Sequence, residues 1–506
     1  MKSLRNVAGF LTRWSLMSGV VSGTLVALSL PKADWYPLAW IALVPLFVVL
    51  ASPMPLRRAA LAGYAAGLAY YAGTCYWITG TMVTYGGLGS LAAFGVAALF
   101  CLSHAFYFAL FGLAVAALCR RYGARALAVA PSLWVAMELV RGYFPLGGFP
   151  WMLSGYALVP YAGILQIATW TGVFGLSFII AAVNASLAYM LLKNDRRFAI
   201  APVLAVLIAW LAPAPAESSS GDAVDVRLVQ PDIALNQRWQ PQEYARLLDR
   251  LISLSVDSAP RAPDATHLIV WPETPAPFAL ADDPEFRRLA ERIAVQSGGY
   301  FLLGYLDSIG EAPSNSAALL DPAGHVVSRY DKIRLVPFGE YVPMKDLLFF
   351  AGKLVEQVGD FAPGSRLTVS NIGKHRLATV ICYESIFPDF SRKFVREGAE
   401  LLVIITNDEW FGSSSAPFQH LRMGVMRAVE NRRYVVRVAN SGITAIIDPY
   451  GRVVSRAPRG EIATLDGVAR FRSELTFYAR YGDVFAVVNV VAALLVGVAA
   501  AVSRRA

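Results

Sequence analysis

Eight apolar runs, each close in length to a membrane-spanning helix, constrain the fold of this 506-residue chain more than any other feature. About 20 apolar residues suffice for a helix to cross the hydrocarbon core of a bilayer. The runs lie near 12–30, 35–52, 58–80, 90–119, 124–141, 161–192, 197–213 and 484–502. They predict an eight-helix transmembrane bundle, with seven helices over residues 1–213 and the eighth, with its tail, over 484–506. One polar domain, residues 214–483, lies between them.

The placement of Lys and Arg predicts the orientation of these helices. Basic residues gather at the N-terminus, at every second connection after it and at the C-terminus, whereas the opposite short loops carry only Lys32 and Arg141. Because basic residues concentrate on the cytoplasmic side of a membrane, both termini are predicted to be cytoplasmic and the polar domain to face outward. The first run also has the length of a secretory signal. It lacks a clear small-x-small cleavage site, and the seven further spans favour an uncleaved helix.

The net charge of +9 follows from this topology. Counted alone, residues 214–483 carry 30 Lys and Arg against 33 Asp and Glu, so the polar domain is slightly acidic. The basic balance therefore reflects cytoplasmic anchors. It does not support binding to nucleic acid.

Cys382 is the only cysteine of the polar domain. Cys75, Cys101 and Cys119 lie within apolar runs, where cysteine is a small packing residue. No disulfide can form within the domain, although an outward-facing compartment would permit one. A solitary thiol in an oxidising space is a liability unless it is buried or used in chemistry.

Short β-branched apolar runs alternate with amphipathic segments along the polar domain, which follows a linker at 212–222. Buried strands are predicted at 224–230, 267–272, 300–306, 377–383 and 401–406. Asp283 and Pro284 are a suitable N-cap and first residue for a helix, and apolar spacing predicts two more helices, at 244–252 and 418–429. Alternating strands and helices predict an α/β layered domain.

Reactive side chains stand directly after several of these strands, where α/β folds present their chemistry. They are Glu273, Cys382, Tyr383, Glu384, Asn407, Asp408 and Glu409. Lys332 and Glu340 lie in a further segment, SRYDKIRLVPFGEYVP. Taken singly, each has an ordinary explanation as a surface carboxylate, a packed thiol or a solvated lysine.

Together, three of these residues suit nucleophilic catalysis. A free thiol has a pKa of about 8.5 and needs a nearby cation and a base to become a competent nucleophile. In the predicted arrangement Lys332 supplies the cation, Glu273 the base and Cys382 the thiol.

The segments WPET, YDKIRLVPFGEYVP and ICYES, in this order, resemble the Glu–Lys–Cys segments of the nitrilase superfamily, whose domain is an αββα sandwich. Joined to eight apolar runs, with the domain between the last two, they make the chain similar to the apolipoprotein N-acyltransferase family, the membrane-embedded branch of that superfamily. The resemblance covers nearly the whole chain. Its most specific part is the unbroken run YDKIRLVPFGEYVP.

The resemblance implies a role for each matching residue of the site. Glu273 would be the general base, Lys332 the group that stabilises the oxyanion, and Cys382 the nucleophile. Glu340 would support Lys332 and the reaction intermediate.

Further residues are assigned by the same resemblance. Tyr383 and Glu384 would hold the site and its loops, and Trp239 matches a tryptophan that shapes the acyl pocket. Glu409 departs from the family pattern, in which a small residue is more usual. The irregular segment 338–366 is interpreted either as an ordinary excursion or as a lid or membrane-dipping arm.

The implied reaction has two steps and needs no cofactor or metal. Cys382 takes an acyl chain from a membrane phospholipid, with phosphatidylethanolamine as the expected donor, and forms a thioester. The α-amine of a diacylglyceryl-modified N-terminal cysteine on an apolipoprotein then receives the chain as an amide. The implied location is the bacterial inner membrane, with the catalytic domain in the periplasm.

Two alternatives use the same topology. A membrane-tethered amidase would hydrolyse C–N bonds with the same three residues, although a water-soluble substrate would not require eight spans. A transporter with a passive outer domain would place ionisable residues in mid-membrane, whereas Glu138, Arg141 and His104 are almost the only ones in the spans.

Two other chemistries receive weaker support. A Cys–His hydrolase would draw on one of the histidines of the polar domain, but no Cys/His family signature surrounds Cys382. A metal site of Asp408, Glu409 and His420 matches no recognised spacing of ligands.

Overall fold

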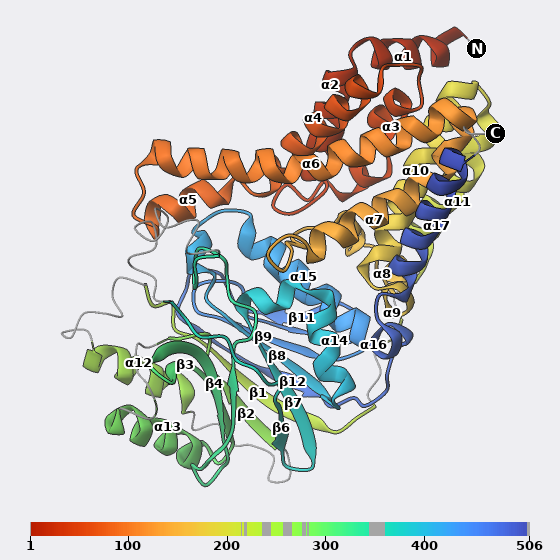
Figure 1. Ribbon diagram of the computed structural model, residues 1–506. Coiled ribbons are helices and arrows are strands. Elements are labelled where there is room, and N and C mark those ends of the chain that lie inside the picture. Colours follow the sequence, from red (N-terminus) through yellow and green to blue (C-terminus); the bar gives the residue numbers. More distant parts are fainter. Residues whose placement is uncertain are drawn as a thin grey trace.

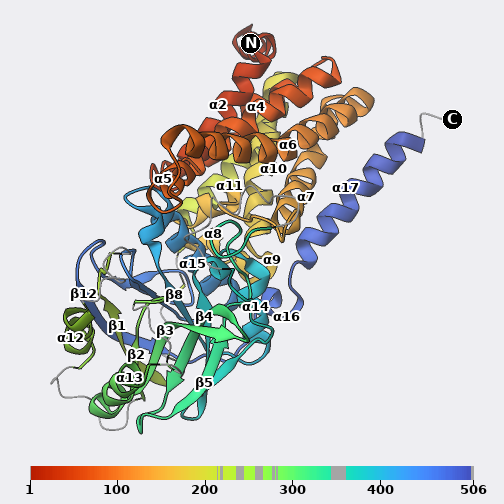
Figure 2. The ribbon, with the colours of Figure 1, turned by 60° about the vertical axis from the view of Figure 1, so that its left-hand side comes forward.

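The computed structural model describes residues 2–213, 215–216, 220–234, 244–256, 266–275, 280, 283–343 and 360–502. Helices from the first 211 residues form one end of the molecule and two β-sheets form the other (Figure 1). The last helix, α17 (Val484–Val502), runs back alongside α7 (Ala130–Tyr143). The start of α1 (Lys2–Arg13) and the end of α17 both lie far from the sheets (Figures 1 and 2).

The helical part contains many short helices beside a few long ones. In chain order, its other elements are α2 (Ser15–Leu28), η1 (Tyr36–Trp40), α3 (Val44–Leu50), α4 (Leu56–Thr74), α5 (Trp77–Thr84), α6 (Ser90–Tyr122), η2 (Gly123–Val129), η3 (Ser154–Leu158), α8 (Ala162–Leu165), α9 (Ala168–Thr171), α10 (Val173–Lys193), η4 (Arg196–Ala199) and α11 (Ile200–Leu211). Each of the eight predicted runs thus contains at least one helix.

The described chain has three segments that are long and apolar enough to cross a membrane. They are Ser90–Tyr143, Val173–Lys193 and Val484–Val502, with shorter apolar segments at Ser15–Leu28 and Tyr36–Leu50. The prediction of eight full-length spans is therefore not confirmed.

Backbone breaks explain part of the difference, and the segment Ser90–Tyr143 contains two of the predicted runs. Gly172 has φ +61° and separates α9 from α10 within the run 161–192. Pro37 and Pro45 begin new helices within 35–52, because a proline lacks the N–H that would continue the preceding turn. Average hydrophobicity does not register such breaks.

Glycines allow α2, α4 and α6 to pack backbone against backbone. A Cβ added to Gly23 would collide with the carbonyl oxygen of Ala66, and one on Gly63 with that of Phe108. Small residues at such crossings permit close van der Waals packing where helices lack a hydrophobic driving force between them. The three helices therefore form a tight unit.

The polar domain consists of two six-stranded sheets packed face to face. The first has the order β12-β1-β2-β3-β4-β5 and the second β11-β10-β9-β8-β7-β6. The strands are β1 (Ala223–Gln230), β2 (Thr266–Val270), β3 (Tyr300–Ile309), β4 (Ala312–Leu320), β5 (Val326–Asp331), β6 (Val369–Ile372), β7 (His375–Ile381), β8 (Leu401–Thr406), β9 (Val435–Ala439), β10 (Ala445–Ile447), β11 (Val453–Arg456) and β12 (Ala463–Arg470). The five predicted strands correspond to β1, β2, β3, β7 and β8.

Helices cover the outer face of each sheet, which completes an αββα sandwich. Helices α12 (Tyr244–Ser255) and α13 (Pro284–Ser297) pack on the first sheet, away from the helical part (Figure 1). Helices α14 (Pro388–Arg396) and α15 (Ala416–Asn431) pack on the second sheet, between it and the helical part. The predicted α/β layered domain is confirmed. So is the predicted cap of α13, since the Asp283 side chain accepts the N–H groups of Glu285 and Phe286.

Buried polar contacts of α15 dock the domain onto the helical part. Gln419 accepts from Trp151 Nε1 at 2.6 Å and donates to the carbonyl oxygens of Pro31 and Thr74. About three turns further along the same helix, Glu430 accepts the N–H of Val173 at the start of α10. The polar domain is thereby attached to the helices at several separate points.

Candidate active site

Three strand ends from the two sheets meet at one place. Glu273 lies after β2, Lys332 directly after β5, and Cys382 begins the turn η7 (Cys382–Ile386) that follows β7. These are the three residues predicted to act together. Lys332 Nζ lies 3.1 Å from Glu273 Oε1, and the charges of both groups act on the Cys382 thiol.

Lys332 is a buried ammonium held by two carboxylates. Its side chain is 1% exposed, and Nζ donates to Glu273 Oε1 at 3.1 Å and to Glu340 Oε1 at 2.7 Å. Burial acts to lower the pKa of Lys332, but the two carboxylates outweigh it and raise this pKa well above its ordinary value. Lys332 is therefore charged at neutral pH.

Asn315, on β4, completes this cluster. Its Nδ2 donates to Glu273 Oε1 at 2.7 Å and to Glu340 Oε1 at 3.0 Å. Its backbone carbonyl oxygen accepts the backbone N–H of Lys332 at 2.8 Å. The sequence analysis missed Asn315. The available signal was an amide side chain directly before the apolar run AALL, where a buried amide needs partners.

The remaining oxygens of the two carboxylates accept backbone donors. The N–H of Asn407 lies 2.8 Å from Glu273 Oε2, and the N–H of Val336 lies 2.8 Å from Glu340 Oε2. Both carboxylates are thus held in fixed orientations. The predicted support of Lys332 by Glu340 has a direct geometric basis in the 2.7 Å contact.

Cys382 occupies a strained backbone position at the end of β7. Its φ is +49°, in the region that side chains rarely adopt. A sharp turn directly after a strand is a known way to present a nucleophile. The residue is 8% exposed. Burial and the charge of Glu273 raise the pKa of the thiol, while Lys332 opposes the increase, so a reaction at sulfur requires a neighbouring base.

Glu384 connects the two sheets beneath the site. Its four donors are the Tyr330 hydroxyl and the backbone N–H groups of Ile333, Arg334 and Ile381, at 2.7, 2.7, 3.1 and 2.8 Å. Burial raises the pKa of Glu384 to about 7, and these hydrogen bonds oppose the increase. Because its donors flank both Lys332 and Cys382 in the chain, one carboxylate fixes the ammonium and the thiol relative to each other.

A second buried polar cluster lies behind Cys382. Asp408 accepts from His420 Nδ1 at 2.9 Å and from Arg437 Nη2 at 2.6 Å. Burial opposes ionisation, but Arg437 and His420 hold the pKa of Asp408 below its ordinary range. His420 Nε2 lies 3.1 Å from the carbonyl oxygen of Cys382 and 2.7 Å from Ser385 Oγ.

The contacts of this cluster argue against two of the alternatives considered from the sequence, a Cys–His hydrolase and a metal site. His420 contacts the backbone of Cys382 through Nε2 and Asp408 through Nδ1, which suits support of the turn. Asp408 is neutralised by Arg437, which disfavours it as a metal ligand.

Two family models match the chain. One, described as the apolipoprotein N-acyltransferase N-terminal domain, matches residues 22–186, and the other, described as carbon-nitrogen hydrolase, matches residues 225–470. The apolipoprotein N-acyltransferase of Geobacter metallireducens is 40% identical over 495 residues, which cover 94% of this chain and 93% of the relative. That of Methylococcus capsulatus is 34% identical, with 93% of each chain covered.

The chain belongs to the apolipoprotein N-acyltransferase family.

Solved structures are also similar to about half of this chain. Nit3 of Saccharomyces cerevisiae is 18% identical with a TM-score of 0.37, and the match covers 51% of this chain and 93% of Nit3. A carbon-nitrogen hydrolase of Helicobacter pylori is 14% identical with a TM-score of 0.35, covering 49% of this chain and 89% of the other. Within the family, the chain is an acyltransferase with a nitrilase-like α/β sandwich domain.

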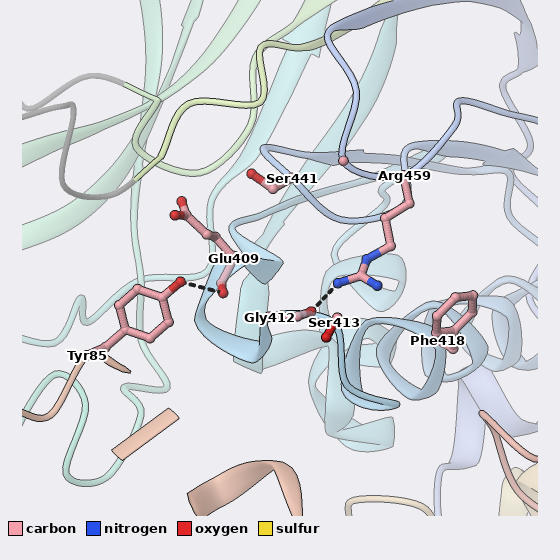
Figure 3. Close-up of a pocket in the computed structure, with 8 residues that line it drawn as sticks. Tyr85, Glu409, Gly412, Ser413, Phe418, Ser441 and Arg459 are labelled. Carbon is pink, nitrogen blue, oxygen red and sulfur yellow. Dashed lines mark hydrogen bonds between the residues drawn. The ribbon is translucent and has the colours of Figure 1, made fainter. Parts of the chain in front are cut away.

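The TNDEWFG segment, which contains Glu409, contacts α5 and the residue that follows it. The Tyr85 hydroxyl donates to the carbonyl oxygen of Glu409 at 2.9 Å, and Thr81 of α5 donates to that of Trp410 at 2.8 Å. Glu409 lines a cavity of about 480 Å3 that Tyr85 and Arg459 also line (Figure 3). The same segment holds Glu273 through Asn407, so it joins the active site to α5.

A second cavity, of about 320 Å3, is lined by residues that follow Lys332, Glu340 and Cys382 in the chain. Tyr383 and Tyr341, which follow Cys382 and Glu340 in the chain, line it together with Phe361. The loop after α7 closes it through Leu146. Tyr383 thus forms part of the cavity wall, and its role in holding the site and its loops stays a prediction.

The loop after α7 is held by Arg141 and Glu138, two of the few ionisable residues within the predicted spans. Arg141 donates to the carbonyl oxygens of Phe149 and Trp151, and Glu138 accepts the N–H of Ser154. Both Arg141 and Glu138 are buried. Their contacts fix the shape of the loop.

Two predictions lie outside the described residues. Trp239, proposed to shape the acyl pocket, is one. The other is the central part of the segment 338–366, residues 344–359 with Phe349 and Phe350.

The raised pKa of Cys382 predicts how its alkylation depends on pH. Iodoacetamide should react about tenfold faster for each pH unit up to about pH 9, because the thiol stays protonated and the thiolate fraction grows tenfold per unit. The measurement is adduct mass against time in a variant with Cys75, Cys101 and Cys119 replaced by alanine. Adding Cys382→Ala gives the background, and a rate that levels off near neutral pH would contradict the effect of burial.

Glu384→Gln should lower the acyl-transfer rate about tenfold or more, because an amide N–H₂ would face backbone donors and release the turn of Cys382. The rate is measured beside the midpoint of thermal unfolding in detergent. Tyr330→Phe, which removes one of the four donors, should cause a smaller loss. Glu397→Gln, on the exposed end of α14, is the matched control, and an equal rate in all variants would refute the role of Glu384.

Proposed function

We propose that this chain N-acylates apolipoproteins in a bacterial inner membrane. It takes an acyl chain from a membrane phospholipid and places it on the N-terminal α-amine of a diacylglyceryl-cysteine. The observation that carries the proposal is a buried thiol beside a carboxylate and an ammonium, in a domain docked onto apolar helices. The family membership supports the same activity.

The first step forms a thioester on Cys382. The sulfur attacks the ester carbonyl carbon of the phospholipid while Glu273 takes the thiol proton. Lys332 stabilises the negative charge that develops on the carbonyl oxygen, and this effect is largest in a water-poor site. The C–O bond then breaks, the proton passes from Glu273 to the glyceryl oxygen, and a lysophospholipid leaves.

The second step forms an amide and restores the thiol. The neutral α-amine of the acceptor attacks the thioester carbonyl, and Glu273 accepts the proton that the nitrogen loses. The C–S bond breaks, and the departing sulfur of Cys382 receives that proton. Each half of the cycle thus uses Glu273 once as a base and once as an acid.

Water must be kept from the thioester, since hydrolysis would waste the acyl chain. The burial of Cys382 and Lys332 supports such exclusion. Glu340 balances the charge of Lys332 during both steps, and Tyr383 with Glu384 positions the turn of Cys382. We assign Trp239 to the acyl pocket on the family resemblance alone.

Mass spectrometry of the purified protein incubated with phospholipid tests this mechanism. We expect a mass gain of one acyl chain on Cys382, removed by hydroxylamine because the bond is a thioester. Cys382→Ser and Cys382→Ala should not gain this mass. Phosphatidylethanolamine should load the enzyme faster than phosphatidylglycerol at equal concentration, if it is the principal donor.

The matched outcomes separate this proposal from its rivals. Lysophospholipid should accumulate in step with acylated acceptor peptide. An enzyme that modifies acceptor peptide without ever carrying the adduct would refute the two-step mechanism. Release of ammonia from amides without acyl transfer would support the amidase.

We also propose a division of the chain into membrane segments 1–213, a periplasmic catalytic domain 214–483, and a last membrane segment with its cytoplasmic tail, 484–506. Eight membrane segments would place both termini in the cytoplasm. The position of α1 and of the end of α17 on the same side of the molecule supports this arrangement (Figure 1).

Labelling with a membrane-impermeant maleimide tests the orientation. In a background with all four native cysteines replaced by alanine, Lys374→Cys on the catalytic domain should react in intact spheroplasts. Arg121→Cys should react only after the membrane is opened. Both native side chains are exposed in the structure, so accessibility within the protein is matched. The reverse pattern would overturn the proposed topology.

A further inference from the structure

The cavity beside the active site has one charged residue among apolar ones. Its described lining includes Leu146 of the helical part and Tyr341, Phe361 and Phe387 of the catalytic domain. Arg334 is the only charged residue among the described ones that line it. A single cation in an apolar cavity of about 320 Å3 suits a ligand that is mostly apolar and carries one negative group.

The positive charge of Arg334 is only partly balanced. Its Nη2 lies 3.1 Å from Asp389 Oδ2, but the same oxygen also accepts from Lys393 Nζ at 2.9 Å. Two cations therefore share one carboxylate. An anion that entered the cavity would meet a guanidinium whose carboxylate partner is also bound by a second cation.

Arg334 is also held in place before any ligand arrives. Its guanidinium lies over the ring of Phe387, 4.1 Å from the centroid, and its backbone N–H donates to Glu384 at 3.1 Å. Arginine is suited to phosphate because its planar fork of N–H donors can bind two oxygens at once. The side chain is 22% exposed, which leaves donors accessible.

Residues that line the cavity are close neighbours of Lys332 and Cys382 in the chain. Arg334 lies two residues after Lys332, and Tyr383, which lines the cavity, directly follows Cys382. The ester bonds of a glycerophospholipid are only a few covalent bonds from its phosphate. A phosphate held at Arg334 would therefore keep an ester of the same molecule close to the sulfur.

We infer that Arg334 recognises the phosphodiester of the acyl donor, with the cavity as the place where the donor's glycerophosphate region sits. This inference rests on the proposed function. The acceptor, a diacylglyceryl-cysteine, has no phosphate, so Arg334 acts in the first half-reaction only. Arg334 is thus a specificity-determining residue for the donor, and Cys382, Glu273 and Lys332 remain responsible for the chemistry.

The test compares two donors on the same enzyme. Arg334→Gln should slow formation of the Cys382 thioester from phosphatidylethanolamine about tenfold or more, because a hydrogen-bonded charge pair is lost. The same variant should react at the wild-type rate with a phosphate-free donor, 4-nitrophenyl palmitate, followed by release of nitrophenol. Thioester that is already loaded should pass to acceptor peptide at the wild-type rate.

Two variants serve as controls. Arg396→Gln removes an exposed cation of α14, outside the described lining of the cavity, so both donors should react as with the wild type. Arg334→Lys keeps the charge and loses the fork, and it should fall between the wild type and Arg334→Gln with the phospholipid.

The outcomes are decisive in either direction. Equal slowing of Arg334→Gln with both donors would show that Arg334 only shapes the site, and no slowing with either would show that it does not bind the donor. Both results overturn the inference while leaving the thioester mechanism intact. Failure of the proposed function itself would appear separately, as absence of any thioester on the wild-type enzyme.

Discussion

A buried ammonium is the constraint on which the active site depends. Taking a charge such as that of Lys332 out of water is costly unless opposite charges and hydrogen bonds replace the solvent. Glu273 and Glu340 supply the charges, and Asn315 ties both carboxylates to the strand beside Lys332. The same contacts that stabilise the ammonium also orient the proposed base, so stability and catalytic geometry have one cause here.

The two sheets must keep a fixed relation for that cluster to face the thiol. Lys332 and Glu273 come from the first sheet and Cys382 from the second. Glu384 spans the gap by accepting donors from β5, from the segment after it and from the end of β7. Arg427 and Glu430 of α15 form a fully buried ion pair of 2.7 Å. Arg427 donates to the Tyr156 hydroxyl and Glu430 accepts the N–H of Val173, so the pair connects the second sheet's helix layer to the helical part. The site is thereby held at a defined place relative to the apolar helices.

The sequence predicted much of the catalytic domain because its local signals agree with its packing. Runs such as LLVIIT are apolar enough to be buried on both faces, and Asp283 before Pro284 is an unambiguous helix start. Weaker strands escaped prediction. The first residues of β4, APSNS, are small and polar, and they become strand only through antiparallel pairing with β3. The helical part was predicted as eight uninterrupted spans. Gly172 and the prolines interrupt helices within runs whose average hydrophobicity is unbroken.

The sequence by itself determined that the chain combines apolar helices with an α/β domain, and which residue types could perform acyl transfer. Those properties reside in composition, periodicity and short motifs, which are local in the chain. Only the tertiary structure decided that Asn315 joins Glu273 to Glu340, that Glu384 links two sheets, and that Arg334 lies in a cavity with Phe387. Each of these contacts joins residues far apart in sequence, and it exists because two separately formed sheets and a loop of the helical part pack against one another.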